Sequence, residues 1–82
     1  MAFDLYGEIR KLSTSLKDAG EVSWGQRLDK AMASGTMPGE VFGALRQELL
    51  ALSRTPIPER LQLKSSIDQS IAFINSYLGP MR

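Results

Sequence analysis

The side chains of this chain that could perform catalysis are carboxylates and hydroxyls. The 82-residue sequence contains neither histidine nor cysteine, so it lacks the usual general base near neutral pH, the thiol nucleophile and the commonest zinc ligands. Asp18 could approach Glu21, Asp29 or Glu40 around helix ends and form an acid–base pair. However, acids also collect at helix termini, because they interact favourably with the helix dipole. We interpret these four residues as structural and predict that the chain is not an enzyme.

Serine hydroxyls are the second group with catalytic potential. A serine nucleophile needs an adjacent base, and the sequence offers no histidine for that role. We expect the serines of the C-terminal segment to face solvent or to bond back to their own helix; they are Ser65, Ser66, Ser70 and Ser76. The sequence therefore predicts no catalytic residue, no cofactor and no metal site.

Charge and composition narrow the classes of partner. Ten basic and nine acidic residues give a net charge of +1, which is too balanced for a surface that binds nucleic acid or an anionic membrane. The start, Met1-Ala2-Phe3-Asp4, lacks the pattern of a signal peptide, and no apolar run approaches the roughly 20 residues of a membrane span. We expect one cytoplasmic domain over residues 1–82.

Apolar residues recur every three or four positions and predict an all-α fold. The predicted helices span residues 4–19, 23–34, 37–53 and 58–78. The residues expected to start them are Asp4, Ser23 (with Glu21 as an alternative, earlier start), Thr36 and Pro58. The residues expected to end the first, second and fourth are Gly20, Gly35 and Gly79. Because the connections are short, consecutive helices should pack antiparallel, which predicts a compact four-helix up-down bundle.

Two features of the predicted helices concern their packing. Leu45 and Ile71 lie in the middle of the two best apolar stripes, so we expect both to be fully buried. Gly39 and Gly43 lie four residues apart, and each costs about 1 kcal/mol relative to alanine inside a helix. Close approach by another helix would compensate for that cost.

The chain has more large apolar side chains than its stripes require. Tyr6 and Tyr77 fall outside the stripes, and the first and last helices of an up-down bundle place them at the same pole. Arg10 follows one turn after Tyr6 and could add a polar contact. Since tyrosine and arginine often anchor interfaces, we predict that Tyr6, Arg10 and Tyr77 contact another protein or a second copy. Alternatively, the two tyrosine rings pack together and close the core.

A small DNA-binding regulator is the alternative function. Ala31, Gly35 and Val41 have the offsets of a helix-turn-helix, and Arg46 with its basic neighbours would then contact phosphates. The near-zero net charge argues against this alternative. We therefore expect no binding to nucleic acid.

The middle of the chain resembles small, uncharacterised bacterial proteins made only of helices, some of which are similar to immunity proteins of toxin–immunity systems. The resemblance extends over about residues 5–78 in layout and is carried by Ala19-Gly20-Glu21, Trp24, Arg27-Leu28, Ser34-Gly35-Thr36, Gly39-Glu40-Val41 and Ala44-Leu45-Arg46. It implies a protein-binding module that blocks a cognate toxin, and it supplies no catalytic residue. Immunity proteins against nucleases are often strongly acidic and this chain is not, which disfavours a nuclease as the target.

Overall fold

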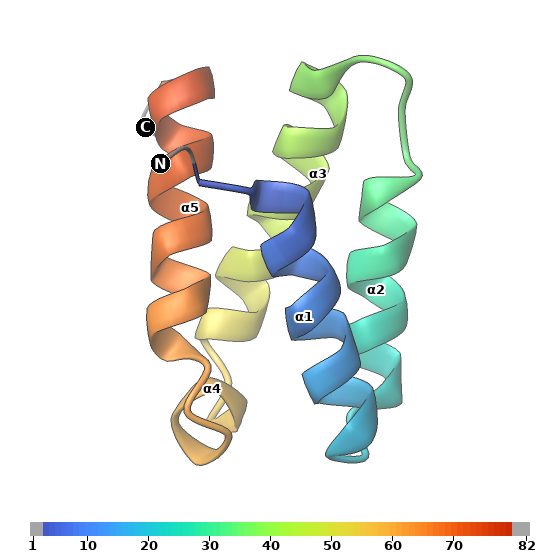
Figure 1. Ribbon diagram of the computed structural model, residues 1–82, viewed down its shortest axis with the longest axis vertical. Helices are drawn as coiled ribbons and strands as arrows, with labels where there is room; N and C mark the ends of the chain where they lie inside the picture. The colour runs from blue at the N-terminus through green and yellow to red at the C-terminus, as the bar shows by residue number, and fades with distance from the viewer. Residues whose placement is uncertain (1–2, 80–82) are drawn as a thin grey trace.

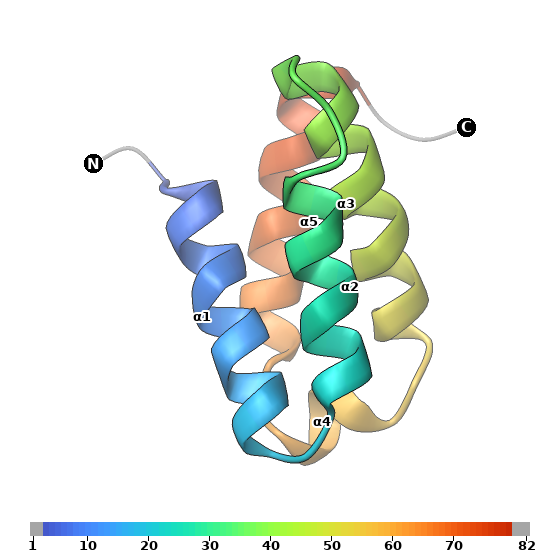
Figure 2. The same ribbon diagram turned by 90° about the vertical axis from the view of Figure 1, so that its right-hand side faces the viewer.

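The computed structural model describes residues 3–79, which form helices and no strand. The helices are α1 (Leu5–Asp18), α2 (Val22–Met32), α3 (Pro38–Ser53), α4 (Ile57–Arg60) and α5 (Lys64–Leu78). The four long helices alternate in direction, and the one-turn α4 lies at one end of the molecule (Figure 1). The view turned by 90° shows the long helices side by side around one compact centre (Figure 2). The all-α prediction is confirmed.

The single helix predicted over 58–78 is wrong, because the chain forms α4 and α5 with a turn between them. Gln62 has a φ of 58°, in the left-handed region. The amides of Gln62 and Leu63 donate to the carbonyls of Glu59 and Pro58 at 3.3 and 2.8 Å. These bonds satisfy the free carbonyls at the end of α4 in a Schellman motif. Since glycine usually takes the left-handed position, a glutamine there concealed the turn in the sequence.

Three predicted end signals are confirmed, at Asp4, Gly20 and Gly79, and those at Ser23, Thr36 and Gly35 are not. The Gly7 amide donates to Asp4 Oδ1 at 3.1 Å, which caps α1 as predicted, and Gly20 has a φ of 89° in the turn after it. The cap predicted at Ser23 is wrong, because Ser23 lies inside α2, whereas the alternative start at Glu21 is the N-cap position. The cap predicted at Thr36 is also wrong, because Met37 precedes α3. Likewise, α2 ends at Met32 rather than at Gly35.

Fourteen buried apolar residues form one core between the helices. They are Leu5, Ile9, Leu12, Leu16, Leu28, Ala31, Val41, Phe42, Leu45, Leu49, Leu52, Ile57, Ile67 and Ile74. Full burial of Leu45 is confirmed, whereas Ile71 is only partly buried. Ser70 takes the central position on α5 instead, because its hydroxyl donates to the Ser66 carbonyl at 2.8 Å and so satisfies a buried polar group.

The closest helix approach involves a different glycine from the two that the sequence suggested. A Cβ added at Gly39 or Gly43 would meet no atom within 4 Å. The prediction that another helix approaches these two glycines closely is therefore wrong. A Cβ at Gly25 would lie 2.7 Å from Lys17 Cγ and 2.9 Å from the Ser13 carbonyl oxygen. The glycine that packing requires is therefore the one where α2 crosses α1.

Candidate functional site

Five aromatic side chains form a connected cluster at the end of the molecule opposite α4, which we call the aromatic pole. Its members are Phe3, Tyr6, Phe42, Phe73 and Tyr77. The Phe42 ring is central, with centroids 6.0 Å from Tyr6, 6.1 Å from Phe73 and 4.8 Å from Tyr77. These separations are those of favourable tilted and edge-to-face pairs. The cluster therefore joins α1, α3 and α5 where α1 and α3 begin and α5 ends.

The aromatic pole leaves part of its apolar surface in water. Tyr77 is 58% exposed and Tyr6 is 36% exposed, although both pack on Phe42, which is only 7% exposed. Met37, directly before α3, is 62% exposed at the same end. Tyr6 and Tyr77 thus lie at the same pole, as the order of the helices predicted, and both pack on the Phe42 ring. The two tyrosines contribute to packing and also present free surface.

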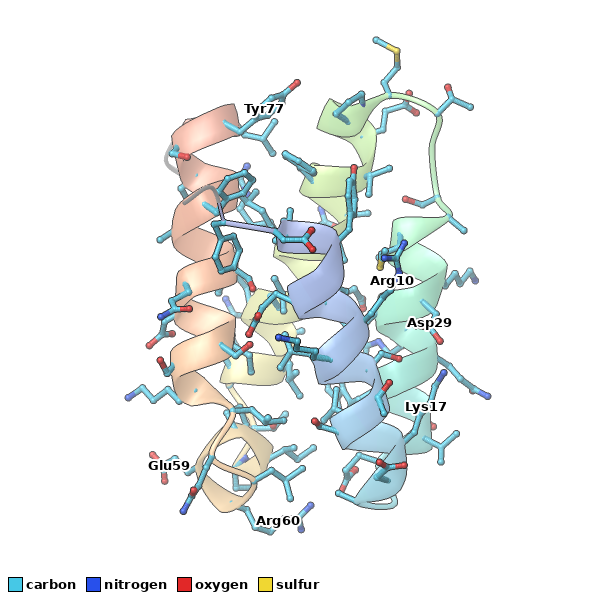
Figure 3. The ribbon with its side chains drawn as sticks, in the orientation of Figure 1. Arg10, Lys17, Asp29, Glu59, Arg60 and Tyr77 are labelled. Carbon is cyan, nitrogen blue, oxygen red and sulfur yellow. The ribbon has the colours of Figure 1, made fainter. Side chains whose placement is uncertain are left out.

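Arg10 lies apart from Tyr77. It is exposed on α1, one turn after Tyr6, and lines a shallow depression with Lys11, Thr14 and Ser15. Figure 3 shows Arg10 beside α2 and Tyr77 at the end of α5. The structure therefore associates Arg10 with the flank of the aromatic pole and not with its centre.

Arg46 fixes the end of α5 on α3. Its Nη1 donates to Asn75 Oδ1 at 2.9 Å and to the Gly79 carbonyl at 2.8 Å. These two acceptors precede and follow Tyr77 in the chain, so the bonds fix the backbone on both sides of that residue to α3. Sequence reasoning assigned Arg46 to phosphate contacts under the DNA-binding alternative and missed this role. The acceptors are 29 and 33 residues away, and no local pattern connects them to the arginine.

Two of the four carboxylates considered for acid–base chemistry, Glu21 and Asp29, have cationic partners. Glu21 accepts from Arg60 Nη2 at 2.6 Å, and Asp29 accepts from Lys17 at 2.5 Å and from Ser13 at 2.8 Å. The hydrogen bonds from Lys17 and Ser13 hold the pKa of Asp29 below its ordinary value, whereas a general acid needs a raised pKa. Within residues 3–79, no group of three or more acidic residues is arranged to hold a metal ion.

A groove of about 320 Å³ runs between α2 and α3. The side chains that line this α2–α3 groove are Arg27, Lys30, Ala31, Ser34, Ala44, Gln47 and Glu48. Arg27 Cζ lies 4.1 Å from the centroid of the Trp24 ring, and the guanidinium donates to both carboxylate oxygens of Glu48 at 2.8 and 3.2 Å. This groove was not predicted, because the two residues of the ion pair lie on different helices. The only sequence signal was the spacing of Trp24 and Arg27, which lie one turn apart.

No helix within residues 3–79 combines the length and the apolar character that crossing a membrane requires. Comparison of the chain with protein-family models, with curated proteins and with solved structures gave no match.

Proposed function

We propose that this chain is a non-enzymatic protein–protein interaction module and that the aromatic pole is its contact surface. The observation that carries the proposal is the exposure of Tyr77, 58%, on a ring that packs 4.8 Å from Phe42. Contiguous apolar groups left in water are typical of protein interfaces, and tyrosine is frequent among residues that dominate binding energy. Tyr6, which packs on the same Phe42 ring, adds exposed surface from α1, and the exposed Met37 lies directly before α3 at the same end.

Preorganisation supports the same proposal. The ring of Tyr77 packs on Phe42, and Arg46 ties the flanking residues Asn75 and Gly79 to α3. A surface that is rigid before binding loses less conformational entropy when a partner arrives. In this proposal the long helices act as a four-helix up-down bundle, a scaffold for the aromatic pole.

The resemblance to immunity proteins supplies the class of partner. We take the partner to be a bacterial toxin that the chain blocks in the cytoplasm by covering one of its surfaces. The DNA-binding alternative has less support, because the arginine that it requires, Arg46, donates to Asn75 and Gly79 within the molecule.

The test uses the protein encoded by the adjacent reading frame as the binding partner. Tyr77→Ser should weaken the complex by about 2 kcal/mol or more, which is about a 30-fold rise in Kd. Val22→Ser is the matched control, because Val22 is also exposed and apolar but begins α2 near the other end. Calorimetry measures Kd, and thermal melting verifies that both variants fold. A complex that tolerates Tyr77→Ser as well as Val22→Ser would contradict the proposal.

A further inference from the structure

The α2–α3 groove contains hydrogen-bond donors that have no acceptor among residues 3–79. Arg27 uses Nε and Nη2 on Glu48, so its Nη1 has no partner among residues 3–79. Lys30 also forms no ion pair in the part of the chain that the structure describes. Both oxygens of Glu48 already accept from Arg27. Arg27, Lys30 and Glu48 therefore give the groove a net charge of +1, and an anionic group there would meet the Lys30 ammonium and the remaining donor of Arg27.

The floor of the groove suits a short apolar stem. Ala31 and Ala44 line it with methyl groups, which leaves room that a larger residue would fill. Trp24 and Glu48 hold the Arg27 guanidinium from two sides. Because the Arg27 guanidinium is already held in place, little conformational entropy of this side chain is lost when a ligand binds. A carboxylate on an aliphatic stem matches this combination of donors and methyl groups.

We propose that the α2–α3 groove binds an acidic segment of a protein partner. Lys30 and the free Nη1 of Arg27 pair with a glutamate or aspartate carboxylate, and the stem of that side chain lies over Ala31 and Ala44. The inference rests on the proposed function only in taking the partner to be a protein. The groove and the aromatic pole share no residue, so each surface can fail its test independently.

Trp24 provides a built-in reporter for the experiment. It is the only tryptophan in the chain, and its ring lies 4.1 Å from the guanidinium that would contact the ligand. The probe is N-acetyl-tetraglutamate, added at low ionic strength, where attraction between exposed charges is least screened. We expect a saturable change in Trp24 fluorescence with tetraglutamate and none with N-acetyl-tetraglutamine. Equal responses to both peptides, or no saturable response, would overturn the proposal.

Three substitutions sharpen the assignment. Lys30→Gln should raise the Kd for tetraglutamate by about threefold or more, whereas Lys11→Gln, the same charge change on α1, should not. Glu48→Gln should lower the Kd, because the competing carboxylate is removed from Arg27. Thermal melting verifies that each variant folds. If Glu48→Gln does not fold, the proposal is tested by comparing the Kd for tetraglutamate of Lys30→Gln with that of Lys11→Gln. Equal weakening by both lysine substitutions would show attraction to overall charge and overturn the proposal.

One further variant separates the two surfaces. Tyr77→Ser should not change the Kd for tetraglutamate, even if it weakens a complex formed at the aromatic pole. A large effect of Tyr77→Ser on the peptide would place the binding outside the groove and overturn the inference.

Discussion

The two ends of the molecule are closed by different chemistry. At the aromatic pole, rings from three helices pack on Phe42 and leave tyrosine surface in water. At the other end, which we call the α4 pole, a one-turn helix and three short connections close the core, and Arg60 pairs with Glu21 at 2.6 Å. Figure 3 shows Arg60 and Glu59 at this end and Tyr77 at the opposite one.

The two ends differ in how far their polar and apolar groups are covered within the chain. At the α4 pole, backbone carbonyls accept from turn amides and Glu21 accepts from Arg60, so these groups satisfy one another within the chain. Exposed ion pairs of this kind contribute about 0–1 kcal/mol each. Aromatic burial contributes more per residue, and the aromatic pole keeps part of that apolar surface uncovered. The aromatic pole therefore stabilises the fold through its buried area, and burial of its exposed area would release further free energy.

The largest effect is expected at the centre of the aromatic pole. Phe42→Ala removes the ring on which Tyr6 and Tyr77 pack, and such truncations cost about 3–5 kcal/mol in free energy of unfolding. That loss is comparable with the whole stability of a small domain. Urea unfolding measures it, with Tyr77→Ser as the comparison, since most of that ring is already in water. Similar small losses for both variants would show that Phe42 does not support the cluster.

A smaller effect of opposite sign is expected at the α4 pole. Gln62→Gly should stabilise the fold by up to about 1 kcal/mol, because glycine adopts the left-handed conformation of residue 62 without a steric cost. Gln69→Gly is the matched control inside α5 and should destabilise by about 1 kcal/mol, the helix propensity of glycine. Thermal melting compares both with the parent. Destabilisation by both glycines to the same extent would mean that residue 62 is not left-handed in solution.

Local patterns predicted the helices best. The first and third helices, expected over 4–19 and 37–53, are Leu5–Asp18 and Pro38–Ser53. Each has an apolar stripe, which acts over a few residues. Asp4 marks the start of the first helix and Pro38 that of the third, although the cap predicted at Thr36 is wrong. The break at Gln62 could not be predicted, because its Schellman motif uses a residue that usually marks helix. Similarly, the spacing of Gly39 and Gly43 could not show that the close helix crossing lies at Gly25.

The candidate site was predicted in part. Chain order alone placed Tyr6 and Tyr77 at one pole, and the structure packs both on Phe42. Arg10 was expected to join them but lies beside α2, because a one-turn spacing on α1 says nothing about the distance to α5. The α2–α3 groove and the bonds of Arg46 were missed for the same reason. They join residues that are far apart in the chain, and only the packing of helices brings them together.

The smallest predicted effect concerns the Lys17–Asp29 pair that joins α1 to α2. The hydrogen bonds from Lys17 and Ser13 lower the pKa of Asp29 from its ordinary value of 3.8. The unfolded chain therefore takes up this proton at a higher pH than the folded chain does. It follows that the stabilisation is complete above pH 3.8 and is lost as the pH falls through the folded pKa.

Asp29→Asn tests this dependence. Because both side chains of the pair are substantially exposed, its contribution should be below about 1 kcal/mol at neutral pH. The melting temperature of Asp29→Asn should be slightly lower than that of the parent at pH 7, and the difference should shrink as the pH falls below the ordinary pKa of 3.8. Asp68→Asn, an exposed aspartate on α5, is the control and should show no such convergence. If the difference in melting temperature stayed the same at low pH, the contribution of Asp29 would come from its hydrogen bond with Ser13 and not from its charge.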